Sequence, residues 1–391
     1  MERFDKSFTR QEPIPEAGIA AAVDVMRSGV LHRYGAEPSQ VAALEAEFAA
    51  QTGAAHCIAV ASGGYAMGCA LRALGVAPAD PVLTNAFTLA PVPGAIAAVG
   101  AVPVLVETTE TLVLDLDDLA ERIAASGARV LMLSHMRGHI VDMEALMAIC
   151  DAAGVAVVED CAHTMGAAWS GVPSGRWGTV GCYSCQTYKH VNSGEGGLIV
   201  TDDADLAARM ILLSGSYMLY DRNGTAPDAE IFARHAGTVP NVSGRMDELR
   251  AAILRPQIAD LPRQVERWNA RYRVLEDGFR AAPGLAIIAR PQAEAYVGSS
   301  IQAVAGDPAR VPSFVAGCAA RGVEWKWFGA ERAVGFTSAH RHWGYLAPQR
   351  LPRTDAALAG LLDMRVPLTF DLDDCALIGR IVADEAARHL A

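Results

Sequence analysis

Short apolar runs alternate with amphipathic stretches along the first half of the chain, after two helices predicted at residues 14–29 and 41–51. The apolar runs predict strands at 56–61, 81–84, 102–107, 130–134 and 155–160, and the stretches between them predict helices at 65–74, 93–99, 116–125 and 143–153. This alternation favours an α/β fold, with a mostly parallel central sheet flanked by helices on both faces. Ligands of such sheets bind beyond the carboxyl ends of the strands.

The pattern changes near residue 178. Residues 178–201 combine short strands with glycines, and a long helical stretch then covers roughly residues 245–281. Beyond it, weaker strand patterns such as 299–304 and a last helix from about residue 373 predict a smaller α+β domain. We place the boundary inside the long helix, with a large α/β domain at 1–254 and a small C-terminal domain at 255–391.

Composition and charge argue against nucleic-acid-binding and membrane proteins. The chain has 33 basic and 44 acidic residues and a net charge of −11, and only three basic residues are lysine: Lys6, Lys189 and Lys326. Nucleic acids and anionic membranes attract clustered positive charge, so neither is an expected partner. Three prolines interrupt the most apolar stretch, residues 89–106, which argues against a membrane helix. Residues 1–10 lack the apolar core of a signal peptide, and the eight cysteines lack metal-type spacing, so we expect a reduced, cytoplasmic protein without a metal site.

Three segments contain candidate chemistry, and each has an ordinary structural alternative. The strand at 155–160 ends on two carboxylates, Glu159 and Asp160, which could protonate a ring nitrogen or cap the next helix. Lys189 lies among small, polar and aromatic residues, and its amine either forms a Schiff base or is a solvated surface group. Gly63 and Gly64 precede a predicted helix and either bind a phosphate or form a tight turn.

Taken together, the three segments supply what pyridoxal 5'-phosphate (PLP) requires. Such a site needs a phosphate cradle, a carboxylate that keeps the pyridine ring protonated, and a lysine that holds the cofactor and moves a substrate proton. The sequence therefore predicts a PLP site, with pyridoxamine phosphate as the aminated form of the cofactor.

The same motifs give the chain a family resemblance from about residue 14 to the C-terminus. It resembles the DegT/StrS-type keto-sugar aminotransferases, PLP-dependent enzymes with the fold type I architecture of aspartate aminotransferase. The strongest matches are Val157–His163 and the stretch from Ser184 through Lys189 to Gly197, and weaker ones lie at residues 61–64, 100–104 and 245–249.

The resemblance implies roles for the residues around the cofactor. Lys189 would carry the cofactor and shuttle the proton, and Asp160 would pair with the pyridinium nitrogen. His163 would lie near the phenolic oxygen of the cofactor, unless it is a core histidine. Ser184 would bind the phosphate together with the backbone and side chains of Gly63, Gly64 and Tyr65.

One further match concerns the subunit arrangement. Asn241 resembles an asparagine that reaches the phosphate of the neighbouring subunit's cofactor, which implies a homodimer with shared active sites. Two extra residues before Arg245 leave Ser243 as a competing candidate for that role.

Other positions depart from the family pattern. Leu89 stands where an aromatic residue usually stacks on the ring, and Phe87 is the candidate substitute. The usual Ser-Gly-Thr becomes Ser62-Gly63-Gly64, so a phosphate-binding hydroxyl is lost, for which Tyr65 could compensate. Gln302 stands where a histidine is common. These departures indicate a side branch of the family.

Two segments have open roles. Residues 135–139, with His135, Arg137 and His139, follow the strand before the Asp160 strand and point to the same edge. They either bind an anionic substrate, order the cofactor or form a polar loop. The aromatic and basic segments 325–328 and 340–343 either close over a substrate or pack the small domain.

The function implied by the resemblance is transamination. The amino group would pass from glutamate or glutamine to a keto group, by default that of a nucleotide-linked keto-sugar, alternatively that of a cyclitol ketone or a small keto or aldehyde metabolite. A related branch dehydrates sugars and has histidine in place of the lysine, so Lys189 argues against dehydration. The rival class is a non-catalytic PLP-binding regulator, which the presence of both Asp160 and Lys189 disfavours.

Overall fold

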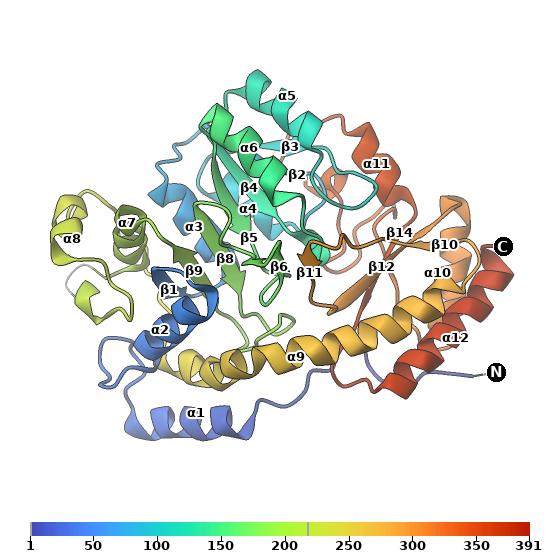
Figure 1. Ribbon diagram of the computed structural model, residues 1–391, viewed down its shortest axis with the longest axis horizontal. Coiled ribbons are helices and arrows are strands. Elements are labelled where there is room, and N and C mark those ends of the chain that lie inside the picture. The colour runs from blue at the N-terminus through green and yellow to red at the C-terminus, as the bar shows by residue number, and fades with distance from the viewer. Residues whose placement is uncertain (1, 217–218) are drawn as a thin grey trace.

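The predicted strands form one seven-stranded sheet in the order β1-β9-β8-β5-β4-β2-β3 (Figure 1). The computed structural model describes residues 2–216 and 219–391. Strand β9 runs antiparallel to both of its neighbours, and every other adjacent pair is parallel, so the predicted α/β fold with a mostly parallel sheet is confirmed. The strands are β1 (His56–Val60), β2 (Pro81–Asn85), β3 (Val102–Val106), β4 (Val130–Ser134), β5 (Ala156–Asp160), β8 (Val180–Ser184) and β9 (Gly197–Thr201).

Helices cover both faces of this sheet because successive strand residues point to opposite sides. On β5, for example, Val157 belongs to one apolar cluster and Val158 to the other. The first cluster is closed by α2 (Gln40–Thr52), α5 (Leu116–Ser126), α6 (Met143–Ala153) and the start of α9 (Glu248–Arg280). The second is closed by α3 (Gly63–Ala73), α4 (Pro91–Ala98) and α7 (Ala204–Ser214).

A second, four-stranded antiparallel sheet forms in the C-terminal part, in the order β10-β12-β14-β13. Its strands are β10 (Leu285–Ile287), β12 (Ser300–Ala305), β13 (Lys326–Trp327) and β14 (Leu361–Arg365), with α10 (Val311–Ala320), α11 (Pro352–Ala359) and α12 (Leu372–His389) around it. Strand β11 (Glu294–Ala295) joins a small sheet with β6 (Ala168–Trp169) and β7 (Val172–Pro173).

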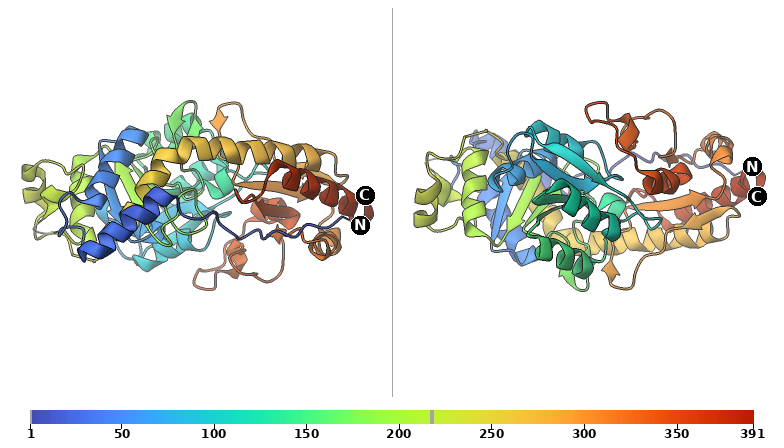
Figure 2. Two further views of the ribbon diagram at one scale, coloured as in Figure 1. Left: turned by 90° about the horizontal axis from the view of Figure 1, so that it is seen from below. Right: turned by 90° about the horizontal axis from the view of Figure 1, so that it is seen from above.

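Helix α9 links the two larger sheets along one side of the molecule (Figures 1 and 2). It packs against α1 (Glu16–Ser28) and α2 near its start and against α12 farther along. The proposed domain boundary between residues 254 and 255 falls inside it and stays a prediction. Both chain ends lie on the small-sheet side, where Phe4 and Phe8 make edge-to-face contacts with Phe370.

Helices α7, α8 (Ala229–His235), α10 and α11 have no counterpart among the sequence predictions. These segments are either short or almost continuously apolar, so they do not show the helical period that identifies an amphipathic helix. None of the helices in the described ranges combines the length and apolar character needed to cross a bilayer.

Candidate active site

The candidate residues meet at one edge of the large sheet because of its strand register. Ser134 at the end of β4 lies opposite Asp160 at the end of β5. Gly197 of β9 pairs with Val60 on one side and Ser184 on the other, which brings the end of β8 beside the turn that follows β1. The carboxyl ends of four strands thus converge, as expected for a ligand site in an α/β sheet.

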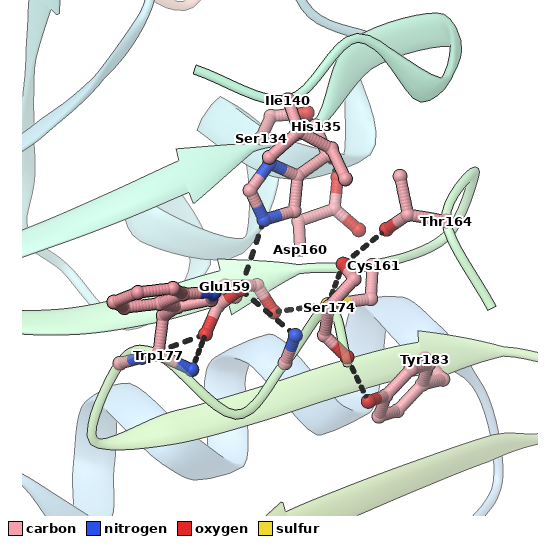
Figure 3. A network of polar contacts seen from close by, with 12 residues as sticks. Ser134, His135, Ile140, Glu159, Asp160, Cys161, Thr164, Ser174, Trp177 and Tyr183 are labelled. Carbon is pink, nitrogen blue, oxygen red and sulfur yellow. Dashed lines mark hydrogen bonds and ion pairs between the residues drawn. The ribbon is translucent and has the colours of Figure 1, made fainter. Parts of the chain in front are cut away.

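The two carboxylates that end β5 point in different directions and have different partners (Figure 3). Glu159 is fully buried and accepts backbone N–H bonds from Gly175, Trp177 and Gly178 at 2.7–2.9 Å. Its Oε2 also lies 2.9 Å from Nε2 of His135. Both oxygens of Glu159 therefore serve to fix the 174–178 loop, and its nearness to His135 and Cys161 is better explained as a structural network than as a metal site.

Asp160 keeps acceptor capacity for a ligand. Its Oδ2 accepts a hydrogen bond from the hydroxyl of Ser134 at 2.9 Å, and its Oδ1 accepts one from the backbone N–H of Ala162 at 3.2 Å. The Ser134 hydroxyl in turn accepts one from Thr88 at 2.8 Å. A carboxylate has about four lone-pair sites, so Asp160 is oriented but not saturated.

Lys189 and His163 form a direct pair. Nζ of Lys189 lies 3.0 Å from Nε2 of His163, and the backbone N–H of Arg137 donates to Nδ1 of the same ring at 3.3 Å. Burial holds the pKa of His163 well below its usual value, and the positive charges of Arg137 and Lys326 act in the same direction. A neutral ring that accepts at Nδ1 carries its proton on Nε2, so it donates to Nζ, and that requires an uncharged amine.

The electrostatics of the site make that uncharged amine more accessible than in an ordinary lysine. The pKa of Lys189 is lowered to about 8, chiefly by burial. Asp160 acts in the opposite direction, and the positive charges of Arg137, Arg365 and Lys326 add to the lowering. An amine with such a pKa is half neutral near pH 8, so near neutral pH a far larger fraction of it than of an ordinary lysine is available as a nucleophile or base.

The pH dependence of acylation tests this pKa. We expect the acylation rate of Lys189 to rise about tenfold per pH unit below pH 8 and to level off above it, because only the neutral amine reacts. Lys6, whose pKa is raised by its hydrogen bond to Asp374, is the internal control, and its rate should still rise beyond pH 10.5. Peptide mass spectrometry after brief treatment with acetic anhydride reads both rates, and a single ordinary profile for both lysines would contradict the assignment.

The turn between β1 and α3 forms a cradle beside Ser184. The hydroxyl of Ser62 caps α3 by accepting from the backbone N–H of Tyr65 at 3.1 Å. A Cβ on Gly63 would lie 2.8 Å from Cβ of Ser184, whereas one on Gly64 would meet no atom closer than 3.9 Å. The helix N-terminus, with its N–H groups and positive dipole end, suits a phosphate held close to the backbone.

Alanine at these two glycines tests the cradle. We expect Gly63→Ala to weaken retention of added PLP by about tenfold or more and to cost about 1–3 kcal/mol of stability, since the methyl group displaces Ser184. Gly64→Ala is the matched control, with stability and retention close to those of the parent. Equilibrium dialysis with absorbance, together with thermal melting, measures both effects, and equal losses in the two variants would argue against the close approach.

The remaining predicted cofactor residues take varied positions. The hydroxyl of Tyr65 donates to backbone carbonyls of Leu213 and Val242, so it is not free to replace the lost phosphate-binding hydroxyl. Phe87 is buried edge-to-face against Phe328 with centroids 5.1 Å apart, while Leu89 is half-buried beside the same cluster. Asn241 and Ser243 are both exposed on the single chain.

The contacts of residues 135–139 show which of the roles left open for this segment its side chains take. His135 bonds Glu159, and His139 lies 2.9 Å from Oε1 of Gln302, so both histidines belong to structural networks. Arg137 instead makes a 3.0 Å ion pair with Asp363 of the small sheet.

Sequence reasoning missed Ser134, Asp363 and Arg365. The alternation of polar Asp363 and Arg365 with apolar Leu362 and Met364 is the pattern that could have identified a second polar face.

The residues present fit PLP. The site offers an amine of low pKa, an oriented carboxylate with spare acceptor capacity, and a helix N-terminus whose glycine lies close against Ser184. When bound, this cofactor supplies an electron sink for breaking bonds at an amino-bearing carbon.

Comparison with known proteins agrees with this geometry. The L-glutamine:2-deoxy-scyllo-inosose aminotransferase of Streptomyces lividus is 33% identical over 281 residues, covering 70% of this chain and 65% of that protein. The dTDP-3-amino-3,4,6-trideoxy-alpha-D-glucose transaminase of Streptomyces venezuelae is 33% identical over 275 residues, covering 68% of this chain and 66% of that protein. The matched part thus spans a little under two thirds of the length of these relatives.

Solved structures and the family pattern extend the match. The structure of 3-amino-5-hydroxybenzoic acid synthase superposes with a TM-score of 0.83 at 26% identity, covering 97% of this chain and 99% of that one. The pattern of the PLP-dependent DegT/DnrJ/EryC1/StrS aminotransferases matches residues 13–379. The chain therefore belongs to the DegT/DnrJ/EryC1/StrS aminotransferase family, with the fold type I architecture.

Proposed function

We propose that this protein is a PLP-dependent aminotransferase that moves an amino group from glutamate or glutamine to a ketone. The observation that supports it most directly is the convergence of Lys189, Asp160 and the start of α3 at one edge of the sheet. A cofactor of this type needs a lysine amine, a charge-stabilising carboxylate and a phosphate cradle, and these three groups meet at this edge.

Each residue has a distinct task in the proposed reaction. Nζ of Lys189 accepts the proton from the donor's reacting carbon and returns one to the product side. Asp160, whose carboxylate is held in place by the Ser134 hydroxyl, would hold the pyridine ring of the cofactor and keep its nitrogen protonated. His163 keeps the amine positioned between these events through its Nε2–H. Ser184 and the N–H groups after Ser62 would hold the phosphate of the cofactor.

We propose a cyclic or sugar ketone as the acceptor. The relatives named for 2-deoxy-scyllo-inosose and for a dTDP-linked amino sugar support a cyclitol ketone and a nucleotide-linked keto-sugar respectively. The nucleotide-linked keto-sugar is the first candidate, and the cyclitol ketone is the second. Glutamine and glutamate are the donors to test first.

The proposed assembly and location rest on other features. Asn241 and Ser243 are exposed on the single chain, as a residue that reaches a neighbouring subunit's cofactor must be, which supports a homodimer with shared sites. All eight cysteines are free and buried, which supports a reducing, cytoplasmic compartment.

Half-reactions test the function. Protein loaded with PLP is mixed with L-glutamate or L-glutamine, and the absorbance of the bound cofactor together with the oxo-acid product is followed. We expect the visible-edge band to bleach in proportion to the oxo acid formed. The aminated protein is then offered sugar and cyclitol ketones, and recovery of the band identifies the acceptor. Cofactor binding without turnover by any donor would instead identify a regulator, and a deoxygenated product would identify a dehydratase.

A further inference from the structure

One face of the small sheet is polar and points toward the large domain. On β14, Leu362 and Met364 enter the apolar core of the small domain, so Asp363 and Arg365 point to the opposite side. The register places Gln302 of β12 and Lys326 of β13 directly opposite Asp363. Charged side chains from two strands thus gather on the face that meets the 136–138 turn.

Positive charge exceeds negative charge on this face. Asp363 is completely buried and pairs with Arg137 at 3.0 Å and Lys326 at 3.6 Å. Burial alone would raise the pKa of Asp363, but the charges of Arg137 and Lys326 outweigh that effect and hold it below its usual value. Three cations, counting Arg365, therefore face one carboxylate, which is an unfavourable balance in a largely buried place.

Arg365 carries the unbalanced charge. Its guanidinium lies 4.1 Å above the ring of Tyr188, the residue before Lys189, and its Nη1 is buried without a hydrogen-bond partner in the described structure. Burial and the charge of Arg137 both lower the pKa of this guanidinium. A buried guanidinium edge without an acceptor is costly unless a ligand supplies one.

The backbone also holds Arg137 in place for this cluster. Arg137 adopts φ +56° and ψ +22°, a left-handed conformation that costs a non-glycine residue about 1–2 kcal/mol. Its N–H contacts His163 and its side chain contacts Asp363, so one strained residue ties the lysine pair to the cation cluster.

We propose that Arg365, which lies over the ring of Tyr188, and Lys326, which pairs with Asp363, form a binding site for a substrate carboxylate beside Lys189. The binding site itself is inferred from the structure, and only the identity of the molecule that carries the carboxylate rests on the proposed aminotransferase function. It belongs either to the amino donor or to a keto acceptor that itself carries a carboxylate. A planar carboxylate matches the free edge of a guanidinium in a bidentate geometry, which the amine of Lys326 complements as a point charge.

Binding of glutarate, a dicarboxylate without an amino group, tests the site without turnover. Calorimetric titration of the cofactor-loaded protein is compared with that of Arg365→Gln, Lys326→Gln and the charge-preserving Arg365→Lys. We expect glutarate affinity to fall about 10- to 100-fold in Arg365→Gln and Lys326→Gln, with partial rescue in Arg365→Lys. Arg280→Gln, at an exposed ion pair on α9, is the matched control and should bind glutarate like the parent.

The half-reactions identify the source of the carboxylate. A loss confined to the reaction with L-glutamate assigns the site to the donor, and a loss confined to carboxylated ketones assigns it to the acceptor. Unchanged glutarate affinity in both neutral variants, with their thermal melting intact, overturns the inference. Arg365-dependent binding of glutarate by a protein that transfers no amino group would sustain this site and reject the proposed function.

Discussion

Replacement of Lys189 by methionine is expected to abolish amino transfer while leaving the fold intact. The rate should fall by about 10³-fold or more, since acid–base catalysis alone contributes about 10²–10⁴-fold and methionine cannot exchange a proton. The folded chain resists protonation of this buried amine, because burial lowers its pKa to about 8 from 10.5. Below pH 8 that resistance destabilises the folded state, so Lys189→Met without cofactor should melt at the same or a higher temperature.

Two other lysine variants sharpen this test. Lys6→Met removes an exposed lysine that pairs with Asp371 and should keep the parent rate. Lys326 is the more demanding comparison, because burial also lowers its pKa to about 8. Lys326→Gln should slow only the half-reaction whose substrate carboxylate it binds, whereas Lys189→Met should stop both half-reactions. Substantial turnover by Lys189→Met would show that another amine performs the chemistry.

Substitution of the two adjacent carboxylates of β5 is expected to have opposite effects, with a loss of rate at Asp160 and a loss of stability at Glu159. Asp160→Asn should lower the rate by roughly 10²-fold or more, because an amide no longer stabilises a positive charge on the ring nitrogen. Its stability should change by about 1 kcal/mol or less, since an asparagine still accepts from Ala162 and still contacts Ser134.

Glu159→Gln should instead unfold more easily. In the parent protein, backbone N–H groups of Gly175, Trp177 and Gly178 donate to the two oxygens of Glu159. A glutamine replaces one oxygen by an NH₂ group, so at least one of these buried N–H groups would face a donor and lose its acceptor. We expect a loss of about 2–4 kcal/mol, seen as a lower midpoint in urea unfolding. The protein that remains folded should keep most of its rate. If Glu159→Gln were stable and inactive, and Asp160→Asn unstable and active, the two roles would be reversed.

Much of the seven-stranded sheet and its covering helices follows from local sequence. Strand and helix periods in residues 56–160 are regular, so alternation alone predicts the sheet, both covering layers and the edge where Asp160 lies. Lys189 and Ser184 are adjacent to that edge in a single segment, and their chemistry is unusual in a chain with three lysines. The strand segment by itself does not distinguish Glu159 from Asp160, and only the family resemblance assigns Asp160 to the ligand. The structure gives the physical reason, because both oxygens of Glu159 bind the loop at 174–178.

The sequence by itself determined the α/β alternation, the family and the Lys189–Asp160 constellation, because each depends on residues close together along the chain or on motifs of fixed spacing. Only the tertiary structure decided that Lys326 and Arg365 act on the pKa of Lys189, although more than a hundred residues separate them from it. Strand β13 has just two residues, and its pairing opposite Asp363 depends on the whole small sheet. Folding brings these charges close to Lys189, and burial strengthens their effect, since electrostatic interactions are stronger where water is excluded.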